Sequence, residues 1–207
     1  LKKVVASIRE EIRSLGGEMV FRARLEDLLI EDGRLRGIAI SNEGQEEIIS
    51  CDQVILAAGH SARDTFAMLH KKGVLIEPKA FAIGVRVEHP ASMINLSQYG
   101  RDPAGILPPA DYKLTHTCTN GRSVYTFCMC PGGYVLNASS EPGHLCVNGM
   151  SNHDRGGRNS NSAVITTVSP SDFGSDHPLS GVEFQRKYEQ LAYFCARGKI
   201  PVQLFGD

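Results

Sequence analysis

The sequence predicts an α+β protein in two parts, an α/β part over residues 1–77 and a mainly antiparallel β part over residues 78–207. In the first part, the unbroken apolar run 54–58 is typical of a strand that is buried on both faces. In the second part, apolar and polar residues alternate from 81 to 88, which is typical of a half-buried strand. This change of pattern near residue 77 predicts a domain boundary.

The first part is expected to begin with a helix and to continue as an antiparallel meander. Apolar residues recur at helical spacing between residues 4 and 15, and Gly16-Gly17 ends the pattern. The meander is expected over residues 18–51. Asp32-Gly33 and the polar stretch 42–44 lie between apolar runs and predict its two tight turns.

The apolar segment 54–59 is the expected parallel strand of the first part. It ends in Gly59, where a backbone can approach a ligand closely. Ser61 and Asp64 follow in the spacing of a capping box, so we expect a helix that begins there and ends at Gly73.

The second part is expected to be rich in short strands. After the alternating strand 81–88, a short helix is expected over 91–98 and a Pro/Gly loop over 100–110. Asn120-Gly121 predicts a tight hairpin turn, and residues 152–162 are expected to form a polar loop. Further strands are predicted at 112–118, 123–129, 134–138, 145–150 and 163–168, a helix at 182–195 and the start of a strand at 201–205.

Composition excludes several classes of protein. The 207 residues are 42% hydrophobic and 22% charged, with a formal net charge of -1, which is an ordinary globular mixture. We therefore expect no nucleic-acid partner and no membrane insertion. The six cysteines are expected to be reduced, as in a cytoplasmic protein. The chain starts with Leu1 inside a helical pattern, so we expect it to be a piece of a longer protein.

Four motifs occur in one order along nearly the whole chain. They are GHSARDTF at 59–66, FAIGVRVEHP at 81–90, FCMCPGG at 127–133 and VNGMS at 147–151. Together with the helix, meander and buried strand, they resemble bacterial, largely uncharacterised FAD-dependent dehydrogenases. The resemblance implies a Rossmann-type FAD domain, of which residues 1–77 are the central and rear part. It implies that residues 78–207 form an inserted β-rich substrate domain.

The resemblance also implies a cofactor and a reaction. The cofactor is FAD, and the reaction passes a hydride between the flavin and an unknown small-molecule substrate or NAD(P)H. The pyrophosphate of FAD normally rests on a Gly-x-Gly-x-x-Gly turn, but no two of the 21 glycines here are separated by a single residue. The chain is therefore expected to lack the phosphate cradle, to hold FAD poorly by itself and to be inactive alone.

Four residues are candidate contacts of the cofactor through the resemblance. Ala58, Gly59 and His60 match the element whose backbone passes close to FAD, and Leu25 matches a stretch that contacts the adenine. Each has an alternative. The 58–60 segment can be a plain turn from strand to helix, Leu25 can be a core leucine, and His60 can be a proton donor or an ordinary turn residue.

Cys128 and Cys130 are weak catalytic candidates, and Gly132 and Gly133 are candidates for admitting substrate. In a flat strand, both sulfur atoms would lie on one face. Three interpretations of the two cysteines remain open: they react near the flavin, they have a thiol redox activity without flavin, or they are small buried core residues.

Arg86 lies on the polar face of its strand, where it can hold an anionic substrate or remain solvated. No metal-ligand spacing occurs, so no metal site is expected. A function of another class also remains open, namely a binding or interaction module without redox chemistry.

Overall fold

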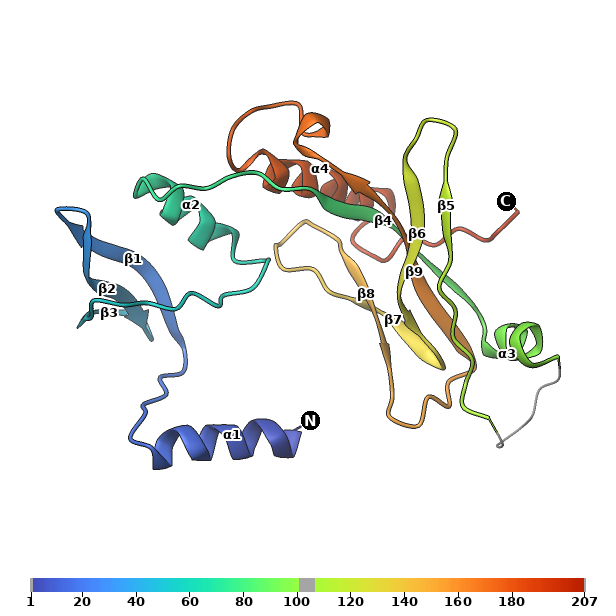
Figure 1. Cartoon of the computed structure of the whole chain (residues 1–207), viewed down its shortest axis with the longest axis horizontal. Coiled ribbons are helices and arrows are strands. Elements are labelled where there is room, and N and C mark those ends of the chain that lie inside the picture. The colour runs from blue at the N-terminus through green and yellow to red at the C-terminus, as the bar shows by residue number, and fades with distance from the viewer. Residues whose placement is uncertain (1, 101–106, 207) are drawn as a thin grey trace. The chain divides into compact units, whose positions relative to one another are not determined.

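The computed structural model describes residues 2–100 and 107–206 and confirms the α+β class (Figure 1). Every strand pair within these residues is antiparallel. The chain divides between Leu75 and Ile76 into two compact units, called here unit 1 and unit 2.

Unit 1 contains a three-stranded sheet in the order β1-β2-β3. Its elements are α1 (Lys2–Ser14), β1 (Ala23–Glu31), β2 (Arg34–Asn42), β3 (Gln45–Ser50) and α2 (Arg63–Lys71). Both predicted turns are confirmed. Asp32 and Gly33 have φ angles of 51° and 71°, and Glu43 and Gly44 have 51° and 87°. Two successive positive φ angles match the twist that a two-residue hairpin needs.

The predicted parallel strand is wrong for this structure. Residues 53–59 form no regular strand, and the side chain of Ile55 is 96% exposed. A parallel strand needs a neighbour that runs in the same direction, and none of the described strands supplies one. The capping box is also wrong, because α2 has Ala62 at its N-cap and no capping side chain. Ser61 instead contacts His60, with 3.3 Å between Oγ and Nε2.

Unit 2 contains a four-stranded sheet in the order β4-β9-β6-β5 and a separate hairpin, β7-β8. The helices α3 and α4 follow β4 and β9 along the chain. The elements are β4 (Phe81–Pro90), α3 (Ala91–Tyr99), β5 (Thr115–Thr117), β6 (Ser123–Cys130), β7 (Gly133–Asn137), β8 (Val147–Ser151), β9 (Asn159–Val168) and α4 (Ser180–Cys195). The Asn120-Gly121 hairpin turn is confirmed between β5 and β6.

The end of the predicted polar loop is instead the start of a central strand. β9 begins at Asn159 and pairs with β4 on one side and β6 on the other. Ser160, Asn161 and Ser162 are 1%, 0% and 0% exposed. Polar side chains are buried in this way when neighbouring elements supply hydrogen bonds, and local sequence does not show those neighbours. The predicted strand at 201–205 is wrong as well, since these residues are irregular and exposed.

Helix α4 is anchored by aromatic packing and by an ion pair. The ring of Phe184 lies 6.1 Å from that of Phe81 and 5.5 Å from that of Phe173, between ring centroids. Arg186 donates two hydrogen bonds to Glu141, at 2.9 and 2.6 Å. These bonds join α4 to the loop between β7 and β8.

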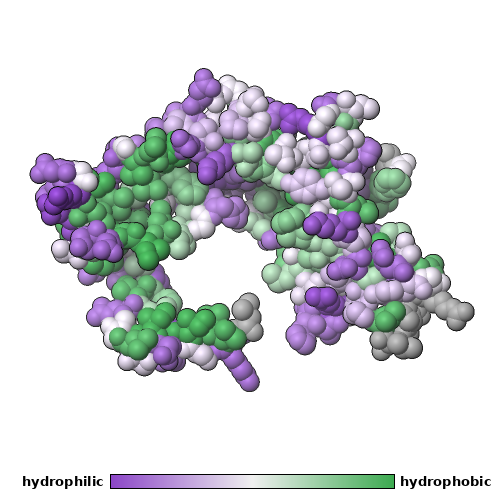
Figure 2. All heavy atoms as spheres, in the orientation of Figure 1, coloured by the Kyte–Doolittle hydropathy of each residue, from purple (hydrophilic) through white to green (hydrophobic). Residues whose placement is uncertain are grey.

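Much apolar surface is exposed. Helix α1 has no buried residue, and its apolar residues Val4, Val5 and Ile8 are each more than half exposed. Figure 2 shows this row of hydrophobic atoms along α1. In the described part of the chain, no helix has the length and apolar character that crossing a membrane requires.

Candidate functional site

Strand β6 carries a bulge at the Cys-x-Cys motif. Phe127 pairs with Ala163 and Cys130 pairs with Asn161, so two residues of β6 lie opposite one residue of β9. Cys128 has a φ angle of 45°, a left-handed conformation in which this kind of bulge usually has glycine. The flat-strand expectation is therefore wrong, because the bulge breaks the alternation. Cys128 is exposed and Cys130 is half-buried.

Arg86 lies on β4 and reaches this bulge across the central strand β9. Its Nε donates to Oδ1 of Asn161 at 2.6 Å, and its Nη2 donates to the carbonyl oxygen of Cys128 at 2.7 Å. The same Nη2 lies 3.3 Å from Sγ of Cys130. Among the described residues, no carboxylate forms an ion pair with this half-buried guanidinium. We call Arg86, Asn161, Cys128 and Cys130 the Arg86 cluster.

The hairpin β7-β8 covers the Arg86 cluster through a glycine. A Cβ atom at Gly149 would lie 2.0 Å from Nη2 of Arg86 and 2.2 Å from Oδ1 of Asn161. Real Cβ atoms do not approach other atoms so closely, so only glycine allows β8 to pack on the guanidinium in this position. Gly149 lies in one of the four motifs, but the sequence alone does not show this requirement.

Gly132 and Gly133 are buried and held by backbone contacts. The N–H of Gly132 donates to Oγ of Ser160 at 3.1 Å, and its carbonyl oxygen accepts from the N–H of Gly157 at 3.1 Å. These glycines thus join the β6-β7 corner to the segment before β9. Their suggested contact with a substrate stays a prediction.

A second polar group consists of His89, Tyr112 and Ser162, and the sequence did not show that these residues meet. Nε2 of His89 and the Tyr112 hydroxyl are 2.7 Å apart, and Ser162 lies close enough to Tyr112 to affect its ionisation. Burial raises the pKa of Tyr112, because the charged phenolate would lose hydration. Nδ1 of His89 is buried without a hydrogen-bond partner among the described residues. The alternation of β4 could have indicated that His89 points away from Arg86, but its partner Tyr112 comes from a loop.

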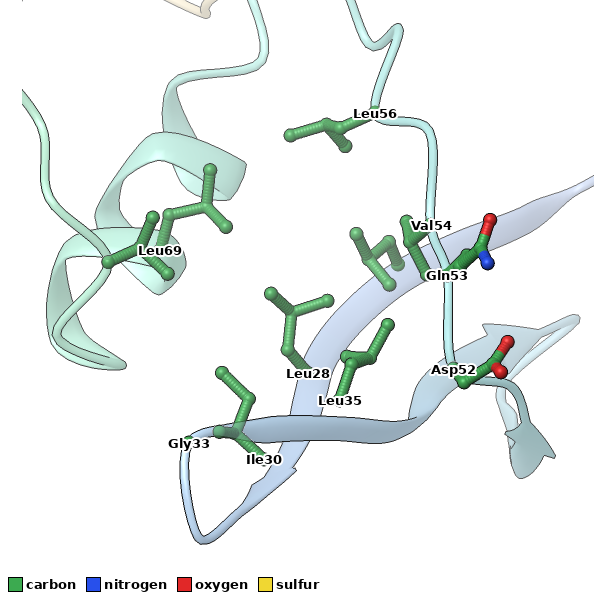
Figure 3. A pocket seen from close by; sticks show the side chains of 11 residues that line it. Leu28, Ile30, Gly33, Leu35, Asp52, Gln53, Val54, Leu56 and Leu69 are labelled. Atoms are coloured by element: carbon green, nitrogen blue, oxygen red, sulfur yellow. The ribbon is translucent and has the colours of Figure 1, made fainter.

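In unit 1, an apolar cavity of about 450 Å³ lies between β1, β2, α2 and residues 52–56 (Figure 3). Leu25 lines it together with Leu28, Val54 and Leu56. Asp52 and Gln53 are the charged or amide side chains in the lining. The cavity therefore suits apolar groups and offers no cationic side chain to a phosphate.

The other three predicted cofactor contacts do not line this cavity. Ala58, Gly59 and His60 are exposed, and Gly59 has a φ angle of 79°. A Cβ atom on Gly59 would meet no described atom within 4 Å, so the space on that side of its Cα is open. With no glycine-rich phosphate turn in the sequence, the described residues do not by themselves form a site that fits FAD. No group of three or more His, Cys, Asp or Glu residues in the described ranges has the arrangement of a metal site.

Comparisons with known proteins identify the family. Residues 80–207 match the family described as "FAD-dependent protein, C-terminal domain-like". A Clostridium beijerinckii protein described as "Uncharacterized protein" is 50% identical over 213 residues, covering 100% of this chain and 39% of that relative. The chain thus spans well under half of this relative's length. The chain belongs to the family of FAD-dependent proteins that carry this C-terminal domain.

Proposed function

We propose that this chain is part of an FAD-dependent oxidoreductase that passes a hydride between the flavin and a small-molecule substrate or NAD(P)H. The observation that carries the proposal is the family match over residues 80–207, which covers all the strands and helices of unit 2. In this proposal unit 2 is the substrate domain, and unit 1 is part of the FAD domain. Leu25, Ala58, Gly59 and His60 remain its candidate cofactor contacts.

The chemistry of the two units supports this division of labour. Unit 2 holds the guanidinium of Arg86, which forms no ion pair with a carboxylate among the described residues, and the His89-Tyr112 pair; both are polar groups of the kind that orient a substrate. Unit 1 holds an apolar cavity and the exposed glycine turn at residue 59. FAD, when bound, would supply the redox chemistry, whereas the chain's own residues would position and desolvate the reacting molecule.

The test compares three proteins: the complete Clostridium beijerinckii relative, the same relative with its matching region replaced by this chain, and the chain alone. Each is mixed with excess FAD, freed of unbound ligand and examined by visible absorption. We expect the relative and the chimera to retain flavin that NADH, NADPH or a substrate bleaches without oxygen. The chain alone should release FAD. A relative without flavin, or with flavin that none of these reductants bleaches, would contradict the proposal.

A variant of the chimera tests whether unit 2 contributes to the reaction with substrate. Arg86→Met should weaken the reaction with substrate and leave FAD retention unchanged, because Arg86 belongs to unit 2. The matched control is Arg122→Met, which removes an exposed guanidinium that pairs with Asp172 elsewhere in unit 2. Equal effects of the two substitutions would argue against a substrate role for the Arg86 cluster.

A further inference from the structure

The Cys-x-Cys bulge has a feature that the proposed function does not use. Six residues other than glycine have a positive φ angle, and Cys128 is the one among the described residues that lies inside a strand. A side chain in this conformation is strained relative to glycine. Strain of this kind persists where surrounding structure enforces it, and here Arg86 holds the Cys128 carbonyl oxygen.

The two thiols of the bulge have complementary surroundings. Cys128 is exposed, so a small molecule in solution can reach its sulfur. Cys130 is half-buried, and its Sγ lies 3.3 Å from Nη2 of Arg86 and 3.3 Å from the carbonyl oxygen of Cys128. A guanidinium beside a sulfur atom is one of the surroundings in which cysteines react as nucleophiles. Among the described residues no carboxylate forms an ion pair with Arg86, and its Nη2 lies against this sulfur instead.

The separation of the two residues permits a bond between them. Even in a regular extended strand, residues two apart have Cα atoms only about 6.6 Å apart, within the roughly 4.4–6.8 Å that disulfides span. Sγ of Cys130 already leans back over the main chain of Cys128, and the exposed side chain of Cys128 can rotate toward it. Bond formation requires Sγ of Cys130 to leave Arg86.

We propose that Cys128 and Cys130 form a peroxide-sensitive dithiol site, in which oxidation to a disulfide releases the Arg86 contact with Cys130. The sulfur of Cys128 attacks one oxygen of hydrogen peroxide, the O–O bond breaks, and hydroxide leaves and takes up a proton to form water. Cys128 is then a sulfenic acid. The sulfur of Cys130 attacks that of Cys128, the S–S bond forms, the S–O bond breaks, and a second water leaves. Two thiols are oxidised and one peroxide is reduced to two waters.

The experiment uses the 207-residue chain and three variants. The folded chain is treated with one equivalent of hydrogen peroxide, its remaining thiols are alkylated, and intact and peptide masses are measured before and after dithiothreitol. Cys128→Gly removes the exposed thiol at a φ angle that suits glycine, and Cys130→Ser keeps a polar atom beside Arg86. Cys195→Ser is the control, because Cys195 is also exposed but lies at the end of α4. Tyrosine fluorescence checks that each variant keeps the fold of unit 2.

The wild-type chain and Cys195→Ser should each lose two thiols and two hydrogen atoms per monomer, and dithiothreitol should restore both thiols. Cys128→Gly should form no bond at residue 130, whereas Cys130→Ser should stop at a sulfenic acid that dimedone traps. Three results would overturn the proposal. The first is a sulfinic acid at Cys128 while Cys130 remains a free thiol, and the second is that every disulfide joins two chains. The third is a disulfide between Cys130 and Cys146 that still forms in Cys128→Gly.

Discussion

Replacing Arg86 with methionine tests whether the Arg86 cluster stabilises unit 2. Methionine keeps an unbranched apolar side chain and removes the guanidinium. The change deletes hydrogen bonds of 2.6 Å to Asn161 and 2.7 Å to the carbonyl oxygen of Cys128. Hydrogen bonds to a charged group contribute about 1.5–3 kcal/mol each. Loss of a half-buried, unpaired cation offsets part of this, so we expect a net loss of about 3 kcal/mol in the free energy of unfolding.

The assay is urea unfolding followed by tyrosine fluorescence. All six tyrosines lie in unit 2 and the chain has no tryptophan, so this signal reports on unit 2 alone. With a denaturant slope of about 2 kcal/mol/M, the midpoint should fall by about 1.5 M. Asn161→Ala and the double variant complete the cycle. We expect the double variant to be more stable than the sum of the single losses predicts, by about 2 kcal/mol.

The reasoning is refuted if Arg86→Met costs less than about 0.5 kcal/mol, which is the range of an exposed surface substitution. It is also refuted if the two single losses simply add, because residues that share a hydrogen bond must show coupling.

Three further predictions concern packing and ionisation. Gly149→Ala should lower the urea midpoint of unit 2 strongly, because the new Cβ atom would overlap Arg86 and Asn161. The control Gly156→Ala should change the midpoint little, since the atom nearest to its new Cβ would be 3.5 Å away. Arg122 lowers the pKa of Asp172 to about 2. The contribution of this ion pair to stability is therefore present above a pH of about 4 and is lost as the pH falls toward 2. Asp172→Asn should remove this pH dependence from acid unfolding curves. Burial raises the pKa of Tyr112, so the folded state loses stability as the pH rises above the ordinary pKa of tyrosine. Tyr112→Phe should remove the tyrosinate step at highest pH from an absorbance titration, and an unchanged titration would contradict this.

Local signals predicted the turns and most helices correctly. Asp32-Gly33 forms the expected hairpin because the positive φ angles required there are intrinsic to those two residue types. The helix expected at 182–195 is observed at Ser180–Cys195, since its apolar spacing is typical of an amphipathic helix. The strand at 81–88 was also predicted correctly. Alternating apolar and polar residues indicate a strand with two different faces, whichever strands it pairs with.

The candidate site was predicted only in its parts. Arg86, Cys128 and Cys130 were singled out, but the sequence did not show that they touch. In the structure Arg86 is the cationic group that contacts Cys130, whereas Arg122 pairs with Asp172. Asn161 was placed in a solvated loop although it is completely buried.

The sequence by itself determined the α+β class, the turns and the chemical types of residue available to the site, because these depend on contacts within a few residues. Only the tertiary structure decided that Ser160, Asn161 and Ser162 belong to the central strand, that β6 bulges at Cys128, and that Gly149 must lack a side chain. The physical reason is common to all three. A buried polar group or a strained backbone is stable only with hydrogen-bond partners and packing from β4, β6 and β8. The residues that contact one another in these elements are 12 to 75 positions apart in the chain and meet only in the fold.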